Sequence, residues 1–496
     1  MEPPRVTLLT VVTSLLSVAI LLTPAHAQGW PEIFDPLQVL TLNLEMNPLD
    51  WATIQNDETF DIEVPANFWA DGEEPILVSV RRKSADPLTE AEGFLKVSLK
   101  IDINEYVSGQ TWHDLKKVSL ENGDDQDVVS EGLAWHLHRL ASGVEGYGYP
   151  AGHGCWVTLY INGIYTGVYV SVEQRDEQFL RNRDLYVSGE TWLYKLGDIG
   201  EAELKVGEGD SPTYEALCYS PFRSDGSACE TPGPATLAAE LPLLVNMQGM
   251  LTLAAVNAFA TNPDALFTHG KNVFFADFLG GRTRMYFPWD LDSVIRDSGS
   301  SIYPSGSAYA EVLLGVPEFH DLFTQIMNNL LCGPLAAGDL VTFLDDVEGL
   351  LAEALENDPN NQIGEDETVA EHFDELRSWV TARVEHAFSE LNIPTSVRIP
   401  ESMSGMSLYQ PRPNPSCTTT RIDWAMRDEG HVRLRIFDTM GRLVTTLVDE
   451  EKRPGEYSVA WRGLDRNGHV VPAGVYFARL HAGPWFSVRE IIRPER

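Results

Sequence analysis

The sequence lacks the short motifs that mark several familiar enzyme classes. No GxGxxG, GxxxxGKS, GxSxG, HExxH or CxxC pattern occurs among its 496 residues. Without a glycine-rich phosphate loop the chain is not a P-loop enzyme, and the standard hydrolase routes have no support. No clustered cysteines and histidines suggest a zinc site.

Cysteines and long apolar runs are also scarce. Of the five cysteines, Cys218 and Cys229 bracket the turn-rich stretch YSPFRSDGSA and are the expected disulfide pair, while the odd count leaves a free thiol. One apolar run, 6–22, follows Arg5 and precedes Ala25-His26-Ala27. We read 1–27 as a secretory signal peptide, with an uncleaved anchor as the alternative. No other run of that length is free of charged or amide side chains, so we expect no integral membrane span after cleavage.

Positive charge is in short supply. The chain has 36 Lys and Arg against 73 Asp and Glu, a net charge of −37. Residues 396–496 hold 15 basic and 12 acidic side chains, so the excess of about −40 falls on residues 28–395. Such a surface repels nucleic acid and anionic membranes. It attracts divalent cations or basic partners, or it only keeps the protein in solution.

The hydrophobic pattern predicts an α+β region followed by an all-β one. Residues 28–92 read as a β-rich part, 93–391 as a mixed domain, 392–407 as a proline-containing linker and 408–496 as a sandwich of about seven strands. Asn162-Gly163 and Gly280-Gly281 sit at the tips of two expected hairpins, 155–176 and 271–292. The other expected strands are 75–84, 93–104, 115–122 and 190–198, and the expected helices are 127–143, 238–260, 308–331, 338–356 and 366–391.

The mixed domain resembles the spore-coat CotH kinase-like family. The matching pieces occur in order: LKKVSLEN, Asp127 with the helix after it, LYINGIYTGVYVSVEQRDEQFL, LYK, Asp264, KNVFFADF and FPWDLDSVI. Members of that family resemble protein kinases in an altered, minimal form. The resemblance implies an atypical kinase domain that binds ATP with Mg²⁺ or Mn²⁺ and phosphorylates a protein side chain.

The resemblance assigns roles to four polar residues. Asp264 matches the catalytic aspartate, and Asn272 and Asp290 match metal ligands, with Asp292 on the same face as Asp290 if the backbone is extended. Lys271 stands where the family usually has His. The structural alternatives are a turn after Asn-Pro for Asp264 and a helix cap for Asp290.

The cation that would hold the ATP phosphates is less defined. Lys116, Lys117 and Lys195 lie in strand-like segments that the family shares, and an inward Glu173 would pair with one of them, as in the kinase Lys–Glu pair. The alternative is that each is a solvated strand lysine.

The C-terminal region resembles FlgD-like immunoglobulin-type modules. The matching stretches are PRPNPSCTTTRIDWAM, VRLRIFDTMGRLVTTL and WRGLDRNGHVVPAGVYFARL. In proteins exported by type IX secretion such a module serves sorting and surface attachment. The usual basic tail is only partly present, as Arg489, Arg493 and Arg496, so a plain structural module is the alternative.

Two functions follow as hypotheses. The first is an exported CotH-like protein kinase acting on a protein hydroxyl, secreted or at the bacterial cell surface. The second is an inactive surface binding or scaffold protein, for adhesion or polysaccharide association. Trp112, Trp135, Trp156 and Trp192 would then form a sugar platform, unless they belong to the core.

Overall fold

A computed structural model describes residues 30–494 of the chain with gaps. Those gaps are 84–95, 124–126, 145–146, 198–201, 218–220, 223–231, 361–362, 364–366, 392–405, 410, 415, 417–418, 427–428, 439–442, 467 and 483–484. The expected signal peptide, the Cys218–Cys229 pair and most of the expected linker lie outside the described residues.

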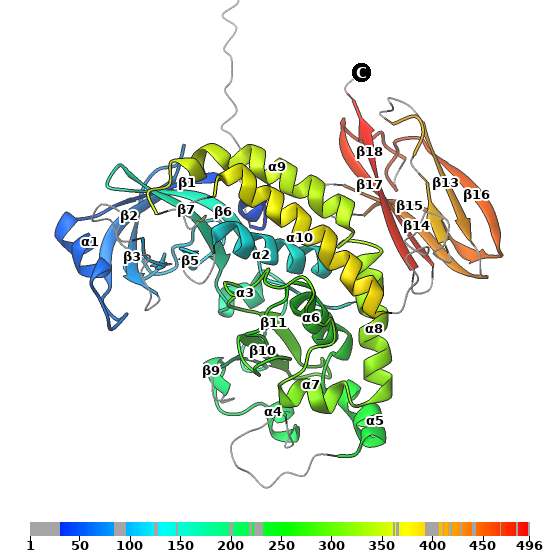
Figure 1. Ribbon diagram of the computed structural model, residues 1–496, viewed down its shortest axis with the longest axis horizontal. Helices are drawn as coiled ribbons and strands as arrows, with labels where there is room; N and C mark the ends of the chain where they lie inside the picture. Colours follow the sequence, from blue (N-terminus) through cyan, green and yellow to red (C-terminus); the bar gives the residue numbers. More distant parts are fainter. Residues whose placement is uncertain are drawn as a thin grey trace, which may run out of the picture.

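A closed barrel forms the N-terminal part of the mixed domain (Figure 1). Its strand order is β1-β2-β3-β4-β5-β7-β6, and the parallel pairing of β1 with β6 closes it. The strands are β1 (Leu40–Glu45), β2 (Val64–Ala70), β3 (Ile76–Arg82), β4 (Leu99–Asp102), β5 (Lys117–Glu121), β6 (Gly154–Ile161) and β7 (Ile164–Glu173). Strands from both sides of residue 92 therefore share one barrel.

The core of the barrel follows from side chains that alternate between the two faces of each strand. Val78 and Val80 of β3 and Ile101 of β4 are fully buried inside, and Ser79 lies on the other face of β3, where it is also buried. The expected hairpin turn is confirmed, because Asn162 and Gly163 both have positive φ, 51° and 76°, as a type I′ turn requires. The helix α1 (Pro48–Gln55), which begins at the capping side chain of Asn47, was not predicted.

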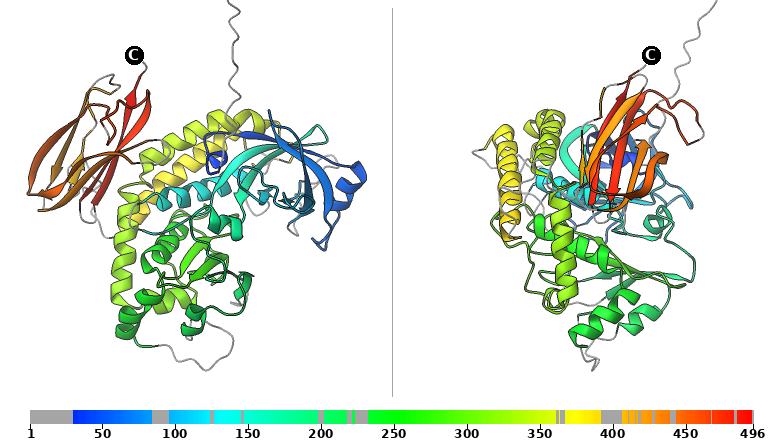
Figure 2. Two further views of the ribbon diagram at one scale, coloured as in Figure 1. Left: turned by 180° about the vertical axis from the view of Figure 1, so that it is seen from behind. Right: turned by 90° about the vertical axis from the view of Figure 1, so that its right-hand side faces the viewer.

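A second sheet and a set of helices make up the rest of this domain (Figure 2). The sheet order is β11-β10-β8-β9, from β8 (Thr191–Leu196), β9 (Ala202–Val206), β10 (Val273–Phe278) and β11 (Met285–Pro288). The helices are α2 (Val128–Ser142), α3 (Glu177–Arg181), α4 (Pro212–Ala216), α5 (Pro234–Leu244), α6 (Met247–Phe259), α7 (Ala308–Leu313), α8 (Pro317–Leu331), α9 (Ala337–Glu356) and α10 (Val369–Glu390). In both views α9 and α10 lie side by side above α2.

Two of the expected single helices are pairs. The stretch 238–260 divides into α5 and α6, because Val245 is extended and the Asn246 side chain caps α6 at Gly249 N. The stretch 308–331 divides into α7 and α8, because Pro317 has no N–H to continue the earlier helix and starts a new one.

The C-terminal region is all β, as predicted, with seven strands in its described part. One sheet has the order β12-β13-β16 and the other β15-β14-β17-β18, and a separate apolar core that includes Trp424 and Trp461 joins them. The strands are β12 (Met406–Leu408), β13 (Thr420–Met426), β14 (Gly430–Asp438), β15 (Leu443–Lys452), β16 (Gly455–Trp461), β17 (Gly474–Ala482) and β18 (Trp485–Arg493).

Burial decides the expectation about the tryptophans, and helix length and hydropathy bear on the expectation about the membrane. The four tryptophans at 112, 135, 156 and 192 are all less than a tenth exposed and belong to the core, so they form no sugar platform. Among the described residues no helix is both long enough and apolar enough to span a bilayer.

Candidate active site

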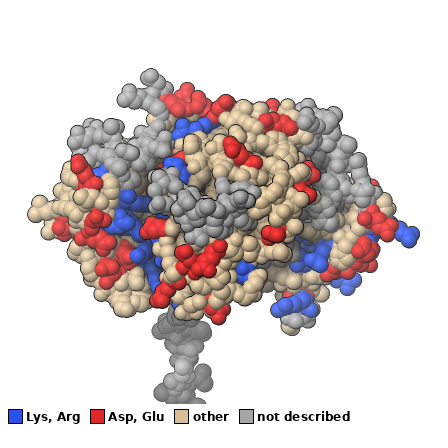
Figure 3. Space-filling view, turned by 90° about the horizontal axis from the view of Figure 1, so that it is seen from below, with Lys and Arg blue, Asp and Glu red and all other residues tan. Residues whose placement is uncertain are grey.

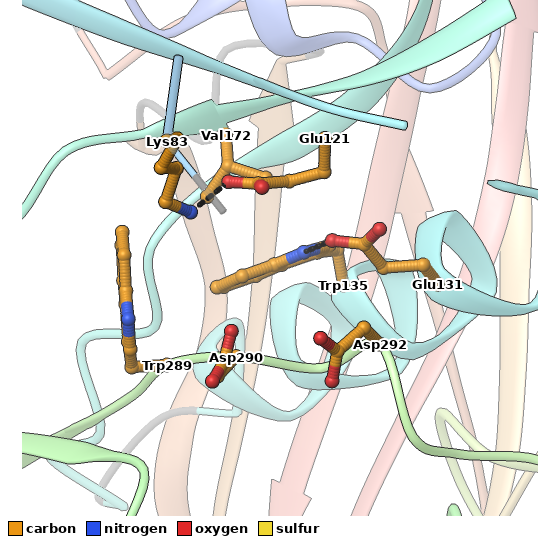
Figure 4. A pocket seen from close by; sticks show the side chains of 8 residues that line it. All are labelled: Lys83, Glu121, Glu131, Trp135, Val172, Trp289, Asp290 and Asp292. Carbon is orange, nitrogen blue, oxygen red and sulfur yellow. Dashed lines mark hydrogen bonds and ion pairs between the residues drawn. The ribbon is translucent and has the colours of Figure 1, made fainter. Parts of the chain in front are cut away.

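A small pocket lies where the barrel, α2 and the loop after β11 meet (Figure 4). Its cavity is about 10 Å³, which is room for about one water molecule. The barrel supplies three of its lining residues, α2 two and the loop three: Lys83, Glu121 and Val172; Glu131 and Trp135; Trp289, Asp290 and Asp292.

Lys83 provides the cation of the pocket. Its ammonium forms an ion pair with Glu121 at the end of β5 and lies 4.7 Å from the centre of the Trp289 ring. Burial lowers the pKa of Lys83, but the carboxylates of Glu121 and Asp290 outweigh it, so the pKa lies above its ordinary value. Lys83 is therefore charged, and its field reaches the loop that carries Asp290.

Glu131 is the most buried carboxyl group of the pocket. It sits on the inner face of α2 with 2% of its surface exposed, and its Oε1 accepts a hydrogen bond of 3.3 Å from Trp135 Nε1. Its Oε2 has no hydrogen-bond partner. Burial, together with the charges of Glu121 and Asp292, raises the pKa of Glu131 well above its usual range. Glu131 thus takes up a proton more readily than an exposed glutamate does.

The loop after β11 presents two aspartates across the pocket from Lys83 and Glu121 (Figure 4). Asp290 has a left-handed backbone, with φ of 59°. Such a conformation is uncommon and recurs at functional sites. The buried Arg175 steadies the start of the loop, since its Nη2 donates to the Pro288 carbonyl at 3.0 Å.

Asp264 and Asn272 form a second group at the same end of the sheet. Asn272 Nδ2 donates to Asp264 Oδ2 at 3.1 Å, and Lys271 Nζ lies 2.9 Å from the same oxygen. Val273 pairs with Pro288, so Asn272 precedes β10 where β11 ends and the Asp290 loop begins. The register thus brings Asn272 and Asp290 to one edge, while Asp264 already has a cationic partner.

The predicted phosphate-binding residues separate into two groups. Lys195, on β8, is near the pocket: burial lowers its pKa, the Asp290 charge acts against this, and the Lys83 charge adds to it. Lys116 and Lys117 lie away from the pocket lining and pair with Glu177 at 3.9 Å and with Asp102 at 2.8 Å.

The expected pair between a lysine and Glu173 does not form. Glu173 is fully buried and binds Arg183 at 2.7 Å, and its Oε1 also accepts from Trp30 Nε1 at 2.9 Å. Burial acts to raise the pKa of Glu173, but Arg183, with smaller effects of His153 and Arg175, lowers it to about 2. The strand does point this carboxylate inward, but a guanidinium takes the place expected for a lysine.

The lysine and the two glutamates of the pocket escaped the sequence analysis. Lys83 ends a run of three cations, Arg81-Arg82-Lys83, and alternation along β3 would have put its first and third members on one face. Glu131 lies on the apolar face of α2, and a carboxylate among buried residues was the available signal.

The oxygen ligands of this pocket suit a hard divalent cation shared with phosphate oxygens. Asp290 and Asp292 supply two carboxylates, and Glu131, whose Oε2 has no hydrogen-bond partner, lines the same pocket. Within the described ranges, no three His, Cys, Asp or Glu side chains converge as a metal cage. Asp290 and Asp292 are therefore the carboxylates of this pocket that a cation could share with phosphate oxygens.

Solved structures show only weak likeness to this chain. PorU in its dimeric latent form from Porphyromonas gingivalis has a TM-score of 0.16 and 14% identity over 18% of this chain and 10% of its own. FlgD from P. aeruginosa has a TM-score of 0.13 and 17% identity over 18% of this chain and 67% of its own. Pseudomonas fluorescens alkylpurine DNA glycosylase AlkC, bound to DNA containing an abasic site analogue, has a TM-score of 0.15 and 10% identity over 38% of this chain and 55% of its own. No curated protein matches the chain.

Family models give a clear assignment. Residues 419–483 match the FlgD Ig-like domain, in agreement with the second, all-β core. Residues 91–387, more than half of the chain, match the CotH kinase protein family. The chain belongs to the CotH kinase family and carries an FlgD Ig-like domain after its kinase domain.

Proposed function

We propose that this chain is an exported atypical protein kinase that transfers the γ-phosphate of ATP to a protein hydroxyl with the help of Mg²⁺ or Mn²⁺. The observation that carries the proposal is the Lys83–Glu121 ion pair facing Asp290 across a pocket between the barrel and the second sheet. A lysine–glutamate pair and a metal-binding aspartate after a strand are the parts that kinases use to position phosphates.

In this proposal the loop aspartates and Asn272 hold the cation. Asp290 and Asp292 line the pocket, and Asn272 leaves the same sheet edge. A divalent cation there would neutralise charge on the phosphates of ATP. Lys83 and Lys195 would contact phosphate oxygens from the barrel and from β8, because both respond electrostatically to Asp290.

Asp264 takes the role of base in this scheme. Its carboxylate accepts the proton of the acceptor hydroxyl while that oxygen bonds to the γ-phosphorus, and the bond from that phosphorus to the β-phosphate oxygen breaks to release ADP. Lys271 Nζ pairs with Asp264 Oδ2 at 2.9 Å and holds the carboxylate in place in the absence of the acceptor. The one-water cavity implies that the barrel and the β11 loop separate when ATP enters.

The test is phosphate incorporation from labelled ATP by purified residues 28–496 with Mg²⁺ or Mn²⁺. Asp290→Asn and Asp264→Asn are expected to lower incorporation about 100-fold or more. Asp290→Asn removes a carboxylate that would hold the cation, and Asp264→Asn removes the proposed base. Asp345→Asn, on the exposed side of α9, serves as the matched control. Incorporation that is equal in all four proteins, or absent from all, would refute the kinase proposal.

A non-catalytic surface or scaffold protein is the second candidate. It is favoured by the small cavity and by the cation that already occupies Asp264. A thermal-shift series separates the two candidates, since a ligand that binds the folded state raises the melting temperature. Stabilisation by Mg-ATP supports the kinase, and stabilisation by a glycan or surface protein without Mg-ATP supports the scaffold.

Export and attachment form the last part of the proposal. Residues 1–27 would direct secretion, and the β-sandwich within 408–496 would serve sorting or attachment at the cell surface. The supporting observation is that this sandwich has an apolar core of its own. Removal of 408–496 is expected to shift the protein from the surface fraction to the medium or the periplasm, and an unchanged distribution would leave the sandwich a structural module.

A further inference from the structure

A cluster of cations covers the outward face of β3, β4 and β5. Arg81 lies directly opposite Lys100 in the strand register, and Lys100 lies opposite Ser119. Lys117, two residues before Ser119, is on the same face. Cross-strand neighbours are about 5 Å apart at Cβ, and like charges placed opposite each other destabilise a sheet. A chain with a net charge of −37 thus keeps a local excess of positive charge here.

Two cations of this face have carboxylate partners. Lys117 pairs with Asp102 at 2.8 Å, and Lys83, which continues the face beyond β3, pairs with Glu121. In the space-filling view Lys and Arg gather on the barrel side of the molecule between groups of Asp and Glu (Figure 3). Because each of these two lysines is balanced by a carboxylate, the excess positive charge of this face comes from its other cations.

The other two cations have no such partner. Arg81 Nη1 donates to the carbonyls of Phe60 and Arg82, at 2.9 and 3.0 Å, and neither carries charge. Lys100 is half-buried and makes no hydrogen bond or ion pair with the described residues. Burial, then the charges of Lys117, Arg81 and Lys83, lower the pKa of Lys100 to about 8, against a smaller opposing effect of Asp102.

We propose that Arg81, Lys100 and Lys117 form a binding site for a phosphate-type anion on the outward face of β3, β4 and β5. A half-buried lysine beside two other cations suits a compact multivalent anion. Charge-assisted hydrogen bonds are stronger than neutral ones, and a half-buried ammonium loses fewer water contacts on binding than an exposed one does. Lys83 lies on this face and in the pocket, so the site is contiguous with the pocket. Its phosphate comes either from the tail of a bound nucleotide or from free inorganic phosphate. The site does not need the chain to transfer phosphate and so goes beyond the proposed kinase activity.

Calorimetric titration of residues 28–496 with sodium tripolyphosphate, inorganic phosphate and metal-free ATP tests the site. Lys100→Gln is expected to weaken tripolyphosphate binding about tenfold or more, whereas Lys100→Arg retains it. Lys452→Gln, in the C-terminal sandwich, is the matched control and should bind as the wild type does. Without anions Lys100→Gln should melt at or above the wild-type temperature, since it removes a repulsive charge.

The dependence on pH gives a second readout. Wild-type affinity for tripolyphosphate should fall from pH 7 to pH 9.5 as Lys100 loses its proton, while Lys100→Arg should stay nearly constant. The other charged groups on this face are Arg81, Lys83, Lys117, Asp102 and Glu121, and they are common to the wild type and Lys100→Arg.

The outcomes separate the sources and the two proposals. Competition between tripolyphosphate and ATP assigns the site to the nucleotide tail, and simultaneous binding assigns it to free phosphate. Absence of binding, or wild-type affinity in Lys100→Gln, overturns the anion site. Binding through Lys100 without phosphate incorporation refutes the kinase and leaves the anion site in place.

Discussion

A buried ion pair between segments 262 residues apart ties α9 to the barrel. Lys96 Nζ lies 2.9 Å from Asp358 Oδ2, and the two side chains are 2% and 0% exposed. Asp358 also accepts backbone N–H groups of Val168, at 2.8 Å, and of Asn360, at 2.9 Å. Asp358→Asn preserves the shape and an acceptor oxygen but leaves the ammonium buried without a counter-charge. We expect a loss of about 3–5 kcal/mol in the free energy of unfolding.

The pH dependence of that loss follows from the lysine. Burial lowers the pKa of Lys96, and the Asp358 carboxylate acts against it. Without the carboxylate the folded-state pKa falls further, so the unfolded chain binds more protons than the folded one up to the ordinary lysine pKa. The stability of Asp358→Asn should therefore rise with pH and approach that of the wild type between pH 7 and 10.

Urea unfolding followed by tryptophan fluorescence at pH 7 and pH 9 measures both effects. Asp345→Asn on α9 removes a carboxylate that is 59% exposed and paired with Arg377, and it should cost less than about 1 kcal/mol. Lys96→Met combined with Asp358→Asn should recover part of the loss. A loss in Asp358→Asn no larger than in Asp345→Asn, or a gap that stays constant as pH rises, would refute the reasoning.

Three further changes test other buried positions of the same domain. Gly167→Ala should destabilise the protein by about 1–3 kcal/mol in the same urea assay, because a Cβ there would lie 2.4 Å from both Asp358 oxygens and φ is +126°; a neutral result would contradict the packing. Glu131→Gln should leave stability below pH 5 unchanged and raise it relative to the wild type as pH increases, because a raised folded pKa costs stability above the unfolded value; thermal melts at pH 5 and pH 8.5 that shift equally would argue against a buried proton. Glu173→Gln should cost about 3 kcal/mol at pH 7, since the folded pKa of about 2 stabilises the fold above the unfolded value of 4.5, and the cost should shrink as pH falls toward 2. If Glu173→Gln instead abolished ATP binding with stability unchanged, its pairing with Arg183 would not be its main role.

The sequence predicted what depends on local pattern. The hairpin around Asn162-Gly163 and the extent of α2 were both foreseen, because alternation, turn residues and a capping Asp127 act within a few residues. The break at Asn246 was missed, because the apolar run continues through it and only a side-chain cap divides it.

The pocket depended on contacts that no local pattern encodes. Asp290 and Asn272 were predicted from the family resemblance, and the register of β10 with β11 brings them to one edge. Lys83 was missed, because its partner Glu121 is on another strand and the pairing is set by barrel closure. Glu173 was correctly expected to be buried, but its partner Arg183 lies in a turn that the sequence left unassigned.

The closure of the barrel by β1 and β6 sets where the catalytic unit begins. The family match starts at residue 91, yet β1, β2 and β3 and the pocket lysine all come before it. A protein cut at residue 91 would expose the edges of β4 and β6, which invite aggregation, and would lack the Lys83 ammonium that lines the pocket with Asp290. If such a protein were inactive, the cause would be the missing strands of the barrel. The result would say nothing about the activity of the complete chain.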